Sequence, residues 1–185
     1  MDALHAILNR SSAITLGEPA PSPEQLNTIL DAGKAAPDHG RLQPWRFVVI
    51  EGEARNILGK TMAELRLAST PDATPEMLAK ETGKAFRAPT IIAVAAAVTE
   101  GGKIPAIEQV MAVAAATQNM FLAAYALGLG AMWKTGGAAY DAKLKTALGL
   151  APADQIVAFL YLGTRTDSQA PVPKQPKVVV HRLKA

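Results

Sequence analysis

Three short segments carry side chains that could bind an anionic ligand or a cofactor. The first, NRSSA, places Arg10, Ser11 and Ser12 directly after an N-terminal helical pattern. A guanidinium fork, two hydroxyls and the backbone amides of a turn form a group suited to a phosphate. The other interpretation is a solvent-exposed helix end that binds nothing.

The second segment, APDHGRLQPWRF, holds two prolines, a glycine and one of only three histidines, His39. It lies between a helix-like and a strand-like stretch. Trp45 is most simply a core anchor that fixes where the strand begins, and QPW then braces the turn. His39 could be a structural histidine or a ligand contact.

The third segment, GAMWKTGG, contains Trp133, Lys134 and Thr135 followed by two glycines. Glycines let a ligand approach the backbone closely. The alternative is a glycine-rich strand exit with no ligand.

Hydrophobic patterning predicts the elements that position these segments. Ser22, Pro23 and Gln25 form a helix start, with serine as the cap and proline in the first turn. That helix should end near Pro37. Buried strands are expected at 45–52, 88–98 and 155–163, a short strand near 130–133, and further helices at 2–9, 53–69, 75–86, 106–127 and 141–150.

The longest helical pattern, 106–127, is apolar around most of its circumference and should be a central buried helix. Its predicted apolar face is Ile107, Val110, Met111, Ala114, Gln118, Phe121, Leu122 and Tyr125. Glu108 and Gln109 argue against a membrane span. The proline-rich segment 165–185 cannot build a core of its own. It is expected to extend across another surface of the chain or of a partner, with strand-like character at Val178–Val180.

Composition limits the function classes. The 185 residues favour a single domain, 1–185, and the absence of cysteine excludes thiol nucleophiles and cysteine-based metal sites. The net charge of +3 is scattered, so no nucleic-acid partner is expected. No secretory signal is apparent, and a cytoplasmic location is expected. No self-contained catalytic motif is present, which is what a cofactor-dependent enzyme would show.

Taken in order, these segments resemble the FMN-dependent nitroreductase family. The resemblance rests on Arg10 and Ser12, on APDHGRLQPWRFVVI, on AAATQNMFLAAYALGLGAMW and on IVAFLYLGT, over residues 2 to about 164. It implies an α+β fold with a mostly antiparallel central sheet flanked by helices. It also implies an intertwined homodimer with an exchanged C-terminal arm and FMN at the subunit interface.

The resemblance also assigns site residues. Arg10, Ser11 and Ser12 would contact the phosphate and ribityl chain, and His39 would contact the flavin of the opposite subunit. Trp133, Lys134 and Thr135 would lie along the FMN. Lys174, or Arg182, would be a second phosphate cation from the C-terminal arm. No metal site is implied.

Three positions depart from the family pattern. Ser11 replaces a second arginine that many members carry, and Thr15 lies near where they have another basic residue. Arg41 occupies the position of an asparagine in the family's PSS-x-N-x-QPW pattern. Phosphate affinity and flavin polarisation are therefore expected to differ from the family norm.

The resemblance implies an NAD(P)H oxidoreductase that passes hydride through flavin N5 to nitroaromatic or quinone-like acceptors, with NADH or NADPH as donor. No side chain is expected to be a proton-transferring catalyst. Lys134 is the first candidate, and Arg41 the second, for a cation that stabilises reduced flavin. The alternatives are a non-catalytic FMN-binding or sensor protein, a cofactor-free dimeric scaffold, and another flavin reaction such as dehalogenation or flavin fragmentation.

Overall fold

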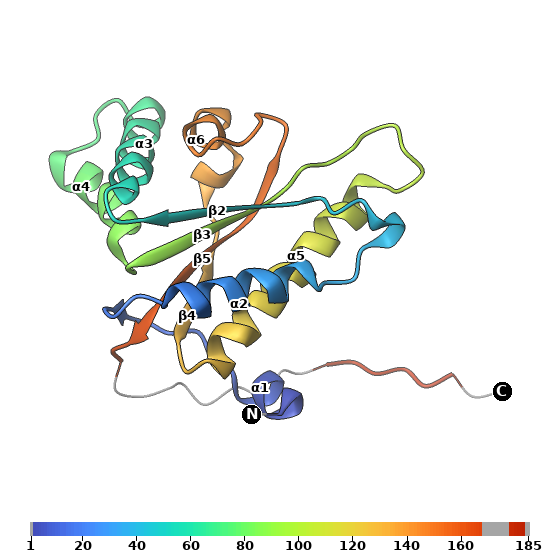
Figure 1. Ribbon diagram of the computed structural model, residues 1–185. Helices are drawn as coiled ribbons and strands as arrows, with labels where there is room; N and C mark the ends of the chain where they lie inside the picture. Colours follow the sequence, from blue (N-terminus) through green and yellow to red (C-terminus); the bar gives the residue numbers. More distant parts are fainter. Residues whose placement is uncertain (1, 168–177, 184–185) are drawn as a thin grey trace.

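A computed structural model describes residues 2–167 and 178–183 of the chain (Figure 1). Its centre is a five-stranded antiparallel sheet in which β1, β5, β3 and β2 follow one another and β4 also pairs with β5. The strands are β1 Leu16–Gly17, β2 Trp45–Glu51, β3 Thr90–Ala96, β4 Gly130–Lys134 and β5 Gln155–Arg165. The predicted antiparallel sheet is confirmed.

Helices cover both faces of this sheet (Figure 1). One face packs against α3 (Ala54–Ser69) and α6 (Ala142–Ala147), with α4 (Pro75–Gly83) beside α3. The other face packs against α2 (Pro23–Lys34) and α5 (Ala106–Ala126), and α1 (Ala3–Asn9) lies against α5. Every residue of β3 is buried, because a strand covered on both faces needs a continuous apolar run rather than alternation.

Local signals in the sequence predict most element boundaries correctly. The Ser22 hydroxyl accepts from the Gln25 amide and the Gln25 side chain accepts from the Ser22 amide, so α2 starts with the predicted capping box. The helix ends at Lys34 rather than close to Pro37. Short 3-10 turns, η1 (His39–Arg41), η2 (Lys84–Phe86) and η3 (Gly137–Tyr140), connect the larger elements.

The long helix α5 is central, and only its ends and first turns are exposed. Val113, Met120 and Ala124 are fully buried, whereas Ile107 and Met111 are 63% and 61% exposed. The prediction of a central buried helix is therefore confirmed over residues 112–125, which are all buried or half-buried, but not for the first turns. The sheet, α2 and α1 all contact this helix.

The end of the chain differs from its predicted local structure. Val178–Val180 are exposed and belong to no strand. A strand needs a hydrogen-bonding neighbour, and the described residues of this chain provide none at that place. Among the helices described, none combines the length and the hydropathy needed to cross a bilayer.

Gly163 marks the point where β5 changes neighbours. It pairs with Gly130 of β4, while the next residue, Thr164, pairs with Gly17 of β1. A Cβ at position 163 would lie 2.7 Å from Pro89 Cδ and 2.8 Å from the Gly17 carbonyl oxygen. Both atoms belong to a ring or to the backbone and cannot rotate away, so only glycine fits here.

We therefore expect Gly163→Ala to lower the free energy of unfolding by about 1–3 kcal/mol, the usual cost of overpacking a core. Urea denaturation measures this change. Gly83→Ala is the matched control, because no atom lies within 4 Å of its added Cβ. Equal stability of the two variants would show that the β1 junction is not tightly packed.

Candidate functional site

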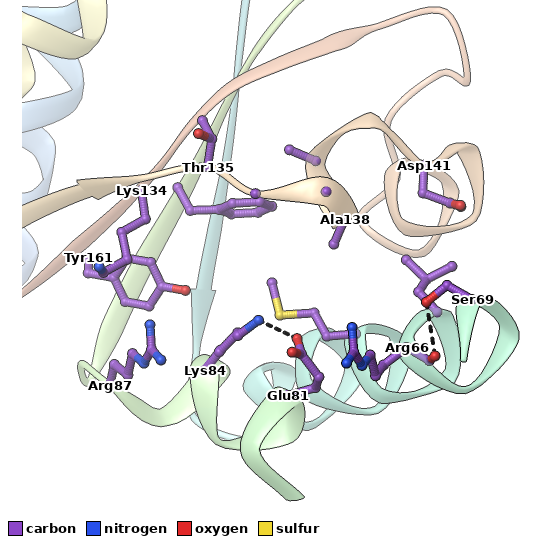
Figure 2. A pocket seen from close by; sticks show the side chains of 16 residues that line it. Arg66, Ser69, Glu81, Lys84, Arg87, Lys134, Thr135, Ala138, Asp141 and Tyr161 are labelled. Carbon is purple, nitrogen blue, oxygen red and sulfur yellow. Dashed lines mark hydrogen bonds and ion pairs between the residues drawn. The ribbon is translucent and has the colours of Figure 1, made fainter. Parts of the chain in front are cut away.

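A hollow of about 610 Å³ lies between the α3–α4–η2 layer and the exit of β4 (Figure 2). A smaller hollow of about 260 Å³ lies next to residues 13–16. Arg87, Lys134 and Tyr161 line both hollows. The two hollows therefore adjoin along β4 and β5 and offer one extended site.

Successive side chains of β4 point to opposite faces of the sheet, so two of the predicted site residues, Trp133 and Lys134, lie on different sides. Lys134 lines both hollows, on the same side as Met132, which packs with the hydrophobic cluster between the sheet and α3 (the α3 cluster). Trp133 packs on the opposite face, into the hydrophobic cluster between the sheet and α5 (the α5 cluster), and its indole Nε1 donates to the Val157 carbonyl at 3.3 Å. A ligand in the hollow can thus meet the side chain of Lys134 but only the backbone of Trp133.

Beyond Lys134 the backbone is open toward the hollow. Thr135, Gly136 and Gly137 line it and are exposed. No atom lies within 4 Å of the positions that a Cβ would take at either glycine. A flat ligand can therefore lie directly against this stretch of main chain.

Tyr161 on β5 contributes a buried phenol to both hollows. Burial raises the pKa of Tyr161 above its ordinary value, and the charge of the nearby Arg87 guanidinium opposes part of that rise. The phenol is consequently protonated at neutral pH and can donate a hydrogen bond. Figure 2 shows Arg87 and Lys134 beside the ring.

The Arg10–Ser12 segment lies outside both hollows. The Arg10 guanidinium stacks 4.3 Å from the centre of the Phe121 ring, and its Nε is buried with no hydrogen-bond partner among the described residues. A buried donor of this kind costs free energy unless an acceptor satisfies it. An anion at this place would supply that acceptor.

Arg165, which the sequence analysis did not single out, is bonded to the predicted phosphate segment. Its Nη1 donates to the Ser11 hydroxyl at 3.0 Å and its Nη2 to the Ser12 carbonyl at 2.6 Å. Its Nε lies 2.8 Å from Asp167 Oδ1 as an ion pair, and Asp167 Oδ2 accepts from the Ile14 amide. A guanidinium therefore stands next to Ser11 although the second arginine of the family pattern is missing from the sequence there.

His39 and Arg41 lie at the other end of α5. His39 Nδ1 is 2.6 Å from Glu108 Oε2. Arg41 is exposed and, like Gln43, has a positive φ, of 55° and 49°. Such backbone values are uncommon outside glycine and are concentrated at functional loops.

The single chain does not unite all the predicted site residues. Arg10 contacts Phe121 and His39 contacts Glu108. These two α5 residues are 13 positions apart, which is about 20 Å along a helix. Lys174 lies outside the described residues, and Arg182 is exposed near the end of the chain.

Three further lining residues, Arg66, Lys84 and Arg87, also escaped the sequence analysis. Arg66 lies on α3, Lys84 lies in η2 and Arg87 directly follows η2, and no motif spacing links them to the β4 exit. In the described parts of the chain, no group of three His, Asp or Glu side chains is arranged to hold a metal ion.

Comparisons with known proteins agree with this architecture. The chain is 43% identical over 164 residues to the Escherichia coli K12 protein named "Putative NAD(P)H nitroreductase YdjA", covering 89% of this chain and 88% of that protein. A crystal structure of a nitroreductase-like family protein from Bacillus cereus superposes with a TM-score of 0.82 at 24% identity, covering 100% of this chain and 97% of that one.

A second solved structure, from Desulfovibrio desulfuricans, is named "a putative nitroreductase in complex with fmn". It has a TM-score of 0.70 at 28% identity and covers 96% of this chain and 99% of its own. Residues 7–164 of the present chain match the family described as the nitroreductase family. With this match, the relative at 43% identity and the shared fold, the chain belongs to the nitroreductase family.

Proposed function

We propose that this protein is an FMN-dependent NAD(P)H oxidoreductase that reduces nitroaromatic or quinone-like acceptors. The observation that carries the proposal is the extended hollow along β4, with Lys134 at its side and open glycine backbone at its edge. The names of the Escherichia coli relative and of the Desulfovibrio complex support the donor and the cofactor. Bound FMN would supply hydride chemistry between the donor and the acceptor.

The chain has side chains of the kinds that bind the phosphate and the ring of FMN. The buried, unpartnered Arg10 Nε can bind an anionic phosphate, and the hydroxyls of Ser11 and Ser12 can add hydrogen bonds. Arg165 holds this segment in place from the end of β5. Lys134 supplies a cation, and Thr135 to Gly137 an open backbone, for a planar ring.

We also propose that the protein forms a homodimer, in which His39 and Arg41 of one subunit complete the cofactor site of the other. Within one chain, His39 contacts α5 at Glu108 and Arg10 contacts it at Phe121, and these two points are about 20 Å apart along the helix. Ile107 and Met111 near the start of α5 are exposed, and Leu4, Ile7 and Leu8 form a second exposed apolar group on α1. Exposed apolar groups of this size are typical of a subunit interface.

The first test is FMN reconstitution followed by turnover. We expect the purified protein to bind FMN and then to oxidise NADH or NADPH when a nitroaromatic or a quinone is added. FMN binding without turnover would favour the sensor alternative. No flavin spectrum after addition of FMN would overturn the proposal.

Arg10→Ala tests the phosphate assignment. We expect the Kd for FMN to rise by at least about tenfold, since a charged hydrogen bond contributes roughly 1.5–3 kcal/mol. Flavin fluorescence titration measures this Kd. Arg46→Ala is the control, because Arg46 is exposed on β2 and its Nη1 donates to the carbonyl of the neighbouring Trp45. An unchanged Kd would remove Arg10 from the cofactor site.

Met111→Lys tests the interface. We expect this variant to shift the protein from dimer to monomer in sedimentation velocity, because a dimer would have to bury the new charge. Ile57→Lys is the matched control, because Ile57 is an apolar residue of α3 that is 52% exposed and lies outside the proposed interface. If Met111→Lys stays dimeric with wild-type affinity between subunits, this face of α5 is not the interface.

A further inference from the structure

More cationic than anionic side chains line the larger hollow. Four cationic side chains line it, Arg66, Lys84, Arg87 and Lys134, against the carboxylates of Glu81 and Asp141. Figure 2 shows Arg66, Lys84 and Arg87 on the helical side, with Lys134 facing them from β4.

Both carboxylates are already engaged. Glu81 forms an ion pair with Lys84. Asp141 caps α6, where its Oδ1 accepts from the Lys143 amide at 2.8 Å. In residues 2–167 and 178–183, Arg66, Arg87 and Lys134 have no carboxylate within ion-pair distance. Three cations therefore face one partly enclosed space, which concentrates positive potential there.

The FMN phosphate does not account for this charge. Its proposed ligands, Arg10 to Ser12, line neither hollow. Their segment lies beside the start of β4, because the next residue, Ala13, donates its amide to the Ala131 carbonyl. Lys134 ends β4, three residues further along an extended strand, about 10 Å away. Arg66 and Asp141 line the hollow together with Thr135 to Ala139, beyond that end.

The floor of the hollow is apolar and partly aromatic. Met62 and Leu65 come from α3, and Phe159 and Tyr161 from β5. A planar apolar group can pack on such a floor while guanidinium forks at the rim bind anionic oxygens. The combination fits a reactant with a flat body and a negatively charged substituent.

We infer that this hollow is a subsite for an anionic group on a reactant, with Arg66 and Arg87 as its specificity-determining residues. The inference rests on the proposed function and extends it to the substrate class. The shared chemistry is a carboxylate or phosphate oxygen. Its source is either an anionic electron acceptor or the additional phosphate that distinguishes NADPH from NADH.

Direct binding to the full-length, FMN-loaded protein tests the inference. Isothermal titration calorimetry compares 4-nitrobenzoate with its neutral analogue 4-nitrobenzamide, and NADP⁺ with NAD⁺. We expect the more anionic member of at least one pair to bind more tightly, by about tenfold or more, because each charged hydrogen bond contributes on that order. The pair that shows the difference identifies the source of the anion.

The variants Arg66→Gln and Arg87→Gln should reduce that affinity ratio by about tenfold. Lys80→Gln is the matched control, because Lys80 is an exposed cation of α4 that does not line the hollow. The ratio should also fall as salt is added, since the hollow is open to solvent. Circular dichroism melting of each variant shows that a changed ratio does not come from unfolding.

Three results would overturn the inference: no discrimination within either pair, an equal effect of all three substitutions, or a loss of FMN affinity with an unchanged ratio. The last result would assign the cations to the cofactor. Failure of the proposed function is distinguishable, because the wild-type protein would then not bind FMN at all. The same titrations on FMN-free protein would still measure the preference for anions.

Discussion

The hydrogen bonding of β5 to three other strands is the constraint on which the rest of the structure depends. One edge of β5 pairs with β3, and the other pairs first with β4 and then, beyond Gly163, with β1. Because this strand is antiparallel to all of its neighbours, one eleven-residue segment fixes the register of the β4 exit and of the N-terminal segment. The candidate site is assembled along this one strand.

Three residues of β5 show how this works. Tyr161 places a phenol beneath the hollows, and Gly163 leaves room for the change from β4 to β1. Arg165 then holds Ser11 and Ser12 through two hydrogen bonds. Alternation sends successive β5 side chains to opposite faces, so Leu160 and Leu162 belong to the α5 cluster while Tyr161 belongs to the α3 cluster.

Local patterns in the sequence predicted the elements well, but they could not predict contacts between distant segments. The Ser22 capping box depends on neighbours three residues apart, and it is present in the structure. The Arg165–Ser11 bond joins residues 154 positions apart, and no local pattern encodes such a pair. Neighbouring residues of a strand point to opposite faces, so the side chains of Trp133 and Lys134 diverge. Which of the two faces the hollow depends on how β4 pairs with β5, and no local pattern encodes that pairing.

The two proposals place unlike chemistry at the two ends of one extended site. At the N-terminal end, the buried Arg10 Nε has no hydrogen-bond partner among the described residues, and a bound anion would satisfy this otherwise costly donor. At the α3–α4 end, the cations are partly exposed, and solvent can satisfy them when no ligand is present. Access to solvent makes the second end suited to a reactant that binds and leaves, whereas the unsatisfied buried Nε of Arg10 makes the first end suited to a retained cofactor.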